Sequence, residues 1–438
     1  MEALNRLTAA DAAAGIKRGD FTSEALVAAC LARIAEREPV VEAWAHLDPN
    51  LARAQARAAD AALRAGRSPG RLHGIPVAIK DIIDTRELPT ENGTPIFAGR
   101  RPAADAAVVG ALKAAGAMIL GKTVTTELAF FAPGKTRNPA DPGRSPGGSS
   151  SGSAAAVADF HVPLALGTQT AGSILRPASF CGAIGWKPTF GLVSRAGVLP
   201  QSRPLDTVGA FARSVEDIAL VMSCLAKPDP ADPDTLGREP SIDWSLSERG
   251  APPKLAFVRQ PAWPLGEQAM HAALLGFVKE LGTRVVTEVE LPESFERGLT
   301  AQQTVQFHDI AQNYGPLLDA HPDKISAKLT EVIGLGRQVS VSDYGAALAL
   351  REPLYAELAG LIQGFDAILT PAAAGPAPIG LGSTGSPAFN ALWTYLGLPA
   401  ISLPLLEAGG LPLGMQLVGR RFEDRRLLAV ARRLMAMV

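Results

Sequence analysis

The sequence predicts an α/β protein with a large central mixed sheet flanked by helices. Short apolar segments rich in β-branched residues alternate with longer segments of helical periodicity along most of the 438 residues. Hydrophobic residues make up 47% of the chain and charged residues 19%, a composition typical of a globular protein with a sizeable core. At this length one large domain or two closely packed ones are both open, and no internal repeat indicates a solenoid.

The first half of the chain is expected to begin with two helices and to continue with strands. Residues 21–39 have amphipathic helical spacing, and we expect this helix to end before Pro39. A second helix is expected over residues 50–66, with Asn50 as its N-cap. Mostly buried strands are expected over residues 74–85, 117–120 and 162–170, with a further helix after Ser153.

The second half repeats this alternation after an interruption. Several prolines and acidic residues between about 227 and 253 predict an excursion of the chain over the surface. Beyond it we expect helical segments between about 267 and 363 and an arginine-rich C-terminal helix. Strands are expected over residues 254–259, 284–291, 365–371, 398–405 and 414–420.

The net charge and the cysteines limit the expected partners and compartment. The 42 basic and 43 acidic residues give a net charge of −1 without a long basic run, which favours a small neutral or weakly charged partner over nucleic acid or a membrane. Cys30, Cys181 and Cys224 are isolated and odd in number, so we expect a reducing cytoplasm and neither a disulfide framework nor a metal site. The N-terminal residues lack the apolar core of a signal peptide, and no apolar run approaches the length of a membrane span.

Two short motifs suggest chemistry that their surroundings do not support. Gly116, Gly121, Lys122 and Thr123 fit the phosphate-binding pattern G-x4-G-K-[ST]. That loop requires a strand before it and a helix after it, whereas here a helix precedes and the intervening residues are themselves strand-like. We therefore interpret the segment as a buried strand with Lys122 at its exposed end.

The second motif is G-x-S-x-G, formed by Gly148, Ser150 and Gly152. A nucleophile elbow needs an apolar strand before the serine and an acid and a histidine after it. The preceding residues GRSPG are no strand, and none of the six histidines stands in a distinguishing context. We interpret all six as structural, because none forms a metal-ligand spacing with another histidine or cysteine either.

A third set of residues is chemically more coherent. Lys80 lies on an apolar strand, a Gly/Ser loop covers residues 147–153, and Ser173 follows another strand on a turn of small residues. A serine hydroxyl becomes a useful nucleophile when a base is available. Burial of Lys80 without a close anion lowers its pKa and allows the neutral amine to be that base, although a solvent-exposed lysine at a strand end is the alternative.

Six segments carry a resemblance to a known family. In chain order they are GIPVAIKDIIDT, GKTVTTELAF, RNPADPGRSPGGSSSGSAAAVA, GTQTAGSILRPASFCGAIGWKPTFG, LPAISLPL and LPLGMQLVG. With them the chain resembles the amidase signature family over nearly its full length. The resemblance implies a single amidase domain over residues 1–438, with the excursion at about 227–253 and a more variable helical region at about 267–363. It also implies hydrolysis of a linear amide without a metal or organic cofactor.

Position by position, the resemblance implies a Ser-cisSer-Lys triad. Lys80 matches the family's catalytic lysine, Ser149 the serine that follows a cis peptide bond, and Ser173 the nucleophile that forms the acyl-enzyme. Neutral Lys80 takes a proton from Ser149, which takes one from Ser173 as that hydroxyl attacks the amide carbonyl. The residues implied to support the loop are Gly147, Gly148 and Ser150, and those implied to form the oxyanion hole with their backbone amides are Thr170, Ala171, Gly172 and Ser173.

The chain departs from the family pattern within the central motif. The family commonly has Asp, Gly and Arg where this chain has Gln169, Ala171 and Leu175, and Arg176 stands one place later. Ser151 replaces a common glycine. Because an acid and an arginine are missing together, neither is left as an unpaired buried charge. These changes favour a stand-alone bacterial-type amidase. The alternative is the A subunit of a glutamyl-tRNA(Gln) amidotransferase, which supplies ammonia from glutamine by the same chemistry.

The favoured interpretation also fixes the expected partners. We expect a small-molecule amide as substrate and ammonia or an amine as product. We expect no nucleic acid or membrane partner, and the one possible assembly is a homodimer. The acyl part of the amide, whether aliphatic, aromatic or urea-like, is not determined by the sequence. Residues expected to shape the substrate pocket are Phe130, Phe131, Asn138, Asn390 and Trp393.

Overall fold

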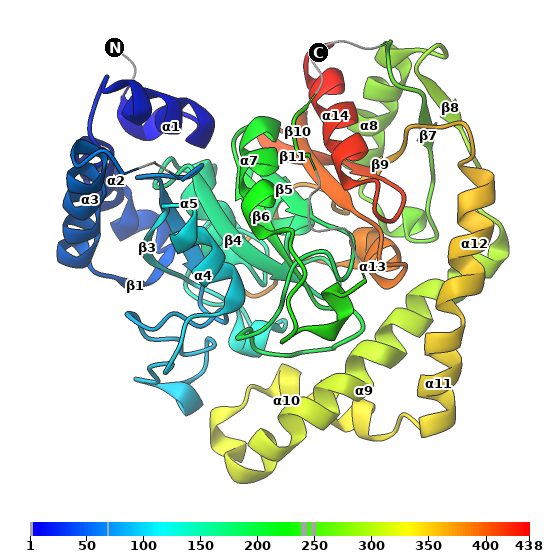
Figure 1. Ribbon diagram of the computed structural model, residues 1–438. Coiled ribbons are helices and arrows are strands. Elements are labelled where there is room, and N and C mark those ends of the chain that lie inside the picture. The colour runs from blue at the N-terminus through cyan, green and yellow to red at the C-terminus, as the bar shows by residue number, and fades with distance from the viewer. Residues whose placement is uncertain (1–2, 68–69, 238–242, 247–250) are drawn as a thin grey trace.

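The computed structural model describes residues 3–67, 70–237, 243–246 and 251–438 (Figure 1). Within these ranges eleven strands form one sheet in the order β1-β3-β2-β4-β6-β5-β10-β11-β9-β7-β8. The strands are β1 (Trp44–Leu47), β2 (Pro76–Lys80), β3 (Met118–Thr123), β4 (Leu164–Gln169), β5 (Ile184–Lys187), β6 (Thr207–Ala212), β7 (Leu255–Phe257), β8 (Val286–Glu288), β9 (Ala367–Pro371), β10 (Ala400–Ala408) and β11 (Leu411–Val418).

The sheet is mixed, as the sequence predicts. Strand β2 runs parallel to both of its neighbours, β3 and β4, and β7 runs parallel to β8 and β9. Between these two parallel sections the strands β4, β6, β5, β10, β11 and β9 pair antiparallel. The five residues of β2 are all buried, which explains why they read as a continuous apolar run rather than an alternating one.

Helices cover the sheet and extend beyond one end of it (Figure 1). The helix α9 leads away from the sheet, and α10 and α11 pack against it. The described α-helices are α1 (Ala9–Arg18), α2 (Ser23–Val41), α3 (Pro49–Arg64), α4 (Ala107–Ala114), α5 (Ser151–Ala158), α6 (Leu175–Cys181), α7 (Val215–Leu225), α8 (Gln268–Leu281), α9 (Glu296–Ala320), α10 (Ala327–Arg337), α11 (Val341–Ala349), α12 (Arg351–Leu361), α13 (Ala388–Tyr395) and α14 (Asp424–Met435).

The Gly/Ser segment forms the start of helix α5 and is not a flexible connection. Helix α5 is made almost entirely of small residues and packs against β2, β3 and β4. Gly152 allows this close approach, because a Cβ atom there would lie 2.2 Å from the carbonyl oxygen of Ala43 and 2.5 Å from the amide nitrogen of Val124. The loop before α5 is thereby held against the carboxyl ends of the parallel strands.

Three local expectations are wrong. Pro39 lies inside α2, in its last turn, where the missing N–H removes only one helical hydrogen bond. The N-cap of α3 is Asp48, whose carboxylate accepts hydrogen bonds from the amides of Asn50 and Leu51. Lys122 is fully buried rather than exposed, because its ammonium lies against Asp81, Pro89 and Thr90 in the segment that follows β2.

Two further observations concern segments outside the core. The expected surface excursion at about 227–253 includes residues 238–242 and 247–250, which lie outside the described residues. Within the described ranges, every helix is too short or too polar to traverse a lipid bilayer.

Candidate active site

Lys80 ends strand β2 in a fully buried position. Its Nζ atom lies 2.7 Å from Ser149 Oγ and 2.8 Å from Thr168 Oγ1, both within hydrogen-bonding distance. Burial lowers the pKa of the Lys80 ammonium well below its usual range, and the charge of Asp206 acts in the opposite direction. The two nearest polar partners are neutral hydroxyls, so a neutral amine at this position can accept a proton from Ser149.

Ser149 sits in the loop between Gly147 and the start of α5. The peptide bond between Gly148 and Ser149 is cis. Gly147 has a φ angle of 78°, and a Cβ atom on it would lie 2.8 Å from Pro177 Cα, so both conformation and space require glycine. The carbonyl oxygen of Gly148 accepts a hydrogen bond of 2.8 Å from Arg176 Nη2, which fixes this loop to helix α6.

Ser150 supports the site without facing it. Its hydroxyl donates a hydrogen bond of 3.2 Å to the carbonyl oxygen of Thr168 and accepts one of 3.3 Å from the amide of the same residue. These bonds hold the backbone of Thr168, whose side chain contacts Lys80. Thr168 is not singled out by the sequence, although it belongs to the quoted GTQT segment.

Ser173 lies in the turn between β4 and α6. Its backbone carbonyl accepts a hydrogen bond of 3.3 Å from the Ser150 amide, which brings the two loops together. Within the described residues, the backbone amides of Thr170, Ala171, Gly172 and Ser173 donate to no protein acceptor. These four amides are the ones that the family resemblance assigns to the oxyanion hole.

One small pocket contains both serines of the expected triad. It is lined by Ser149, Ser173 and Arg176, by neighbours of the nucleophile, and by side chains from distant segments. The remaining lining residues are Ala129, Phe130, Phe131, Ala171, Gly172, Gln306 and Pro387. Phe130, Phe131 and Pro387 also line a second pocket of about 350 Å³ further out, so the two cavities adjoin.

Asp206 lies beside the loop that precedes Ser173, and three hydrogen bonds hold its carboxylate in place. Its carboxylate accepts hydrogen bonds from Thr170 Oγ1 at 2.5 Å and from the amides of Gln201 and Ser202 at 2.8 and 2.9 Å. Burial raises the pKa of Asp206 to about 6, and these hydrogen bonds oppose that shift. Asp206 thus connects the loop before Ser173 with the segment that follows β5.

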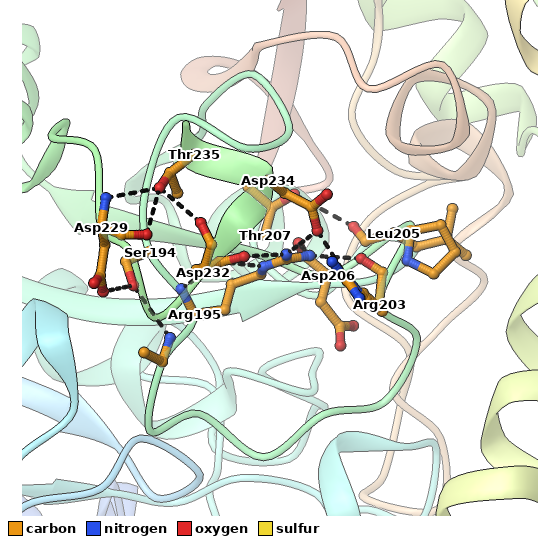
Figure 2. Close-up of polar contacts among 12 residues, drawn as sticks. Ser194, Arg195, Arg203, Leu205, Asp206, Thr207, Asp229, Asp232, Asp234 and Thr235 are labelled. Atoms are coloured by element: carbon orange, nitrogen blue, oxygen red, sulfur yellow. Dashed lines mark hydrogen bonds and ion pairs between the residues drawn. The ribbon is translucent and has the colours of Figure 1, made fainter. Parts of the chain in front are cut away.

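A network of charged groups anchors that segment (Figure 2). Arg195 pairs with Asp232 at 2.6 Å and Asp234 at 2.5 Å, and its guanidinium also donates to the carbonyl oxygens of Arg203 and Asp206. The guanidinium therefore has two carboxylates as partners, and its pKa is raised by them against the effect of burial. Arg195 thus contacts the backbone carbonyl of Asp206, while the side-chain carboxylate of Asp206 accepts a hydrogen bond from Thr170.

Gln169 fills the place where the family commonly has an aspartate. Its Oε1 accepts hydrogen bonds from the amides of Ile174 and Leu175, at 2.8 and 3.0 Å, and its Nε2 donates to Thr394 Oγ1 at 2.9 Å. Because these amides belong to the first turn of α6, Gln169 caps the helix that follows Ser173. A neutral residue performs this structural task without requiring an arginine at position 175.

The residues expected to shape the pocket divide into two groups. Phe130 and Phe131 line it.

The other three expected residues do not line this pocket. Asn138 is buried, and its Nδ2 donates to the carbonyl oxygens of Ser145 and Phe180, so it holds the loop. Trp393 packs in a separate part of the core. Asn390 lies behind Gly172, where a Cβ atom would be 2.6 Å from Asn390 Oδ1.

The competing motifs have other environments. Lys122 lies 3.1 Å from Asp81 Oδ1 and donates to Thr90 Oγ1, so the lysine of the phosphate-loop pattern is part of a buried ion pair. Among the described residues that line the pocket around Ser173 there is no histidine. Within the described ranges, no group of three or more histidine, cysteine or acidic residues is placed to hold a metal ion.

Comparison with known proteins places the chain in a class and a family. The family model described as Amidase matches residues 25–428, so the chain belongs to the amidase family, whose members hydrolyse carbon–nitrogen bonds. The A subunit of glutamyl-tRNA(Gln) amidotransferase from Chloroflexus aurantiacus is 35% identical over 98% of this chain and 96% of the relative.

Solved structures confirm the amidase signature fold. A structure described as an unexpected vestigial protein complex that reveals the evolutionary origins of an s-triazine catabolic enzyme superposes with a TM-score of 0.91 at 28% identity, covering 98% of both chains. A peptide amidase in complex with the competitive inhibitor chymostatin superposes with a TM-score of 0.86 at 29% identity, covering 99% of this chain and 97% of the other.

The relatives correct one sequence-based expectation. The sequence favours a lone enzyme with a small-molecule partner, no nucleic acid and a homodimer at most. The curated relatives are named as one component of an amidotransferase that acts on a charged tRNA, so this expectation is wrong. The net charge of −1 is a poor guide, because the charge of one chain says nothing about the surfaces that other components of an assembly contribute.

Proposed function

We propose that this chain hydrolyses the side-chain amide of glutamine and supplies the ammonia as the amidase component of a glutamyl-tRNA(Gln) amidotransferase. The chemistry is supported by one observation, the 2.7 Å contact between Lys80 Nζ and Ser149 Oγ beside the pocket that also contains Ser173. The biological role is supported by 35% identity over 98% of the chain to relatives named as the A subunit of this amidotransferase. A cytoplasmic location follows from this role as part of the proposal.

The proposed reaction begins with a proton transfer. Neutral Lys80 accepts the proton of Ser149, Ser149 accepts that of Ser173, and Ser173 Oγ forms a bond to the amide carbon. The oxyanion of the tetrahedral intermediate is stabilised by backbone amides among residues 170–173, each worth roughly 3–4 kcal/mol in the transition state. As the carbon–nitrogen bond breaks, Ser149 returns the proton to nitrogen and ammonia leaves. Water then hydrolyses the ester on Ser173 and releases glutamate.

The chemical half of the proposal is tested at Ser173. Replacing it with alanine removes the attacking atom from a turn of small residues, and we expect ammonia release from glutamine to fall by roughly 10⁴-fold or more. Ser151→Ala is the matched control, because among the described residues that hydroxyl has a single partner, the carbonyl oxygen of Val124. Turnover above background by a folded Ser173→Ala protein contradicts the assignment of the nucleophile.

The biological half is tested with the assembly. The full chain is purified with the proteins that accompany it in its own cells and assayed for conversion of glutamyl-tRNA(Gln) to glutaminyl-tRNA(Gln) with glutamine as amide donor. We expect conversion with the wild-type chain and none with Ser173→Ala. An assembly that hydrolyses amides but forms no glutaminyl-tRNA(Gln) contradicts the amidotransferase role and leaves the amidase chemistry standing.

A further inference from the structure

Arg176 is a buried cation placed beside the two expected catalytic serines. It lies in the first turn of α6, three residues after Ser173, and only 1% of its surface is exposed. It lines the same pocket as Ser149 and Ser173. Its guanidinium also lies over the ring of Phe131, 5.9 Å from the ring centre, so aromatic and cationic groups share one wall.

Only one nitrogen of this guanidinium, Nη2, has hydrogen-bond partners among the described residues. Nη2 donates to the carbonyl oxygen of Gly148 at 2.8 Å and to Thr384 Oγ1 at 3.3 Å. Nε and Nη1 are buried without a hydrogen-bond partner among the described residues. A Cβ atom on residue 172 would lie 3.1 Å from Nη1 and 2.6 Å from Asn390 Oδ1, so only a glycine at this position leaves Nη1 uncovered by a side chain.

Arg195, close to the same site, has the carboxylate counter-ions that Arg176 lacks among the described residues. Its guanidinium is paired with the carboxylates of Asp232 and Asp234. Arg176 forms no ion pair among the described residues, and burial lowers the pKa of its guanidinium to about 9. A buried charge without a counter-ion is costly, and the usual solution in proteins is an anion that also completes the hydrogen bonds. The free N–H groups on Nε and Nη1 can each donate a charge-assisted hydrogen bond to an anionic oxygen.

We propose that Arg176 binds a carboxylate carried by the acyl part of the substrate. The ligand class is therefore an ω-carboxy or α-carboxy amide, of which glutamine is one member. This inference rests on the proposed function, because it requires that the same pocket hydrolyses the amide. The carboxylate replaces the missing counter-ion while the amide carbon lies at Ser173. Arg176 is thus the residue that selects anionic over neutral amides.

The test uses pairs of amides that differ only at the far end. Glutaramate and pentanamide have the same chain length and differ by a carboxylate in place of a methyl group, as do succinamate and butanamide. With ammonia release as the readout, we expect wild-type kcat/KM to favour the better anionic member by about 10- to 100-fold over its neutral partner, the scale of a charge-assisted contact. In Arg176→Met the ratio falls to about one.

Two controls keep a structural role apart from a recognition role. Arg351→Met makes the same substitution in another largely buried arginine outside the pocket, and the ratio should stay at its wild-type value. Because Arg176 also holds the Gly148 carbonyl, Arg176→Met can slow both substrates, but loss of recognition shows only in the ratio. If that variant does not fold, thermal unfolding of the wild type with glutarate or with 1,5-pentanediol decides, and stabilisation by glutarate alone is expected.

The outcomes separate this inference from the proposed function. Any one of three results overturns the carboxylate site. These results are a wild-type enzyme with no preference for the anionic amides, a preference that survives in Arg176→Met, and equal stabilisation by glutarate and the diol. Glutamine turnover with such a result leaves the proposed function intact. Conversely, an Arg176-dependent preference among the other amides without glutamine turnover overturns glutamine as the substrate and leaves the carboxylate site standing.

Discussion

Two fully buried lysines lie on neighbouring parallel strands and have opposite surroundings. In the register between β2 and β3, Ile79 pairs with Lys122 and Lys80 with Thr123. Lys122 has a carboxylate partner, Asp81 at 3.1 Å, and donates to Thr90 Oγ1 and to the carbonyl oxygen of Pro89. In the part of the chain that the structure describes, the Lys80 amine forms hydrogen bonds with two hydroxyls, those of Ser149 and Thr168.

The difference shows that burial alone does not make a lysine a base. Burial lowers the pKa of both ammonium groups, but for Lys122 the adjacent Asp81 opposes this effect through both charge and a hydrogen bond. For Lys80 the pKa is lowered well below its usual range, with only the charge of Asp206 in opposition. Lys122 and Asp81 therefore form a structural pair, whereas Lys80 has no carboxylate among its hydrogen-bond partners in the described ranges and suits the proposed proton exchange with Ser149.

Between the two lysines, the largest expected effect is the loss of activity in Lys80→Arg. A guanidinium keeps its proton at any working pH, so it cannot accept one from Ser149 although it preserves charge and approximate length. We expect kcat/KM for amide hydrolysis to fall by about 10³-fold or more, the scale for loss of a general base. Lys122→Arg is the matched control, because an arginine can keep the pair with Asp81, and it should retain most activity. Similar losses in both variants would remove the distinction between the two lysines.

The next effect concerns stability and the other lysine. Lys122→Met leaves Asp81 buried and unpaired, and we expect the free energy of unfolding to fall by roughly 3–5 kcal/mol, as measured by urea denaturation. Burial already raises the pKa of Asp81. The folded variant therefore binds a proton more readily than the unfolded chain, and the loss should shrink as the pH is lowered.

A double variant checks the origin of that loss. Removing the acid as well, in Lys122→Met with Asp81→Asn, eliminates the unpaired charge and should recover a substantial part of the stability. A double variant as unstable as Lys122→Met alone would show that packing around Lys122, rather than the ion pair, stabilises this part of the sheet.

The same comparison shows what can and cannot be predicted from the sequence. Lys80 stands out because an apolar strand with one lysine is visible in the sequence, and the mixed sheet is predicted because its strands alternate with helices. The burial of Lys122 is not visible, since the groups that its ammonium contacts, in Pro89 and Thr90, lie 33 and 32 residues earlier in the chain. Thr168 and Asp206 contact or influence Lys80 from segments far along the sequence, and only the folded arrangement shows this.

For Arg176, too, the sequence predicts only part of what the structure shows. Its position, one place later than the arginine of the family pattern, is visible in the sequence. The consequence for hydrogen bonding is not visible, because it depends on which nitrogen of the guanidinium donates to the Gly148 carbonyl and on the close approach of Gly172 to Nη1. The partners escape prediction for another reason, namely that composition describes one chain and an assembly has several.

A third prediction uses pH to sharpen the contrast. If neutral Lys80 is the base, kcat/KM should rise with pH by up to tenfold per unit below the pKa of that lysine and then reach a plateau. Asp206→Asn removes the anion that raises this pKa, so the rise should move to lower pH even if the plateau is lower. Lys122→Arg should leave the position of the rise unchanged. A rise that stays in place in Asp206→Asn contradicts the electrostatic coupling between Asp206 and Lys80.

The smallest effects are expected at the histidines, which offer the conventional alternative to a lysine base. His46 pairs with Glu91 at 3.1 Å, and His161 is buried against Trp44 and Asp159, so the contacts of both are structural. Each His→Ala variant should keep kcat/KM within about tenfold of wild type, because changes in packing act on the site only indirectly. The measurement is the same amide assay on all six variants, with thermal unfolding to identify those that are merely less stable. A single histidine variant that is folded yet inactive, together with an active Lys80→Arg protein, would assign the base to that histidine and make Lys80 a second structural lysine.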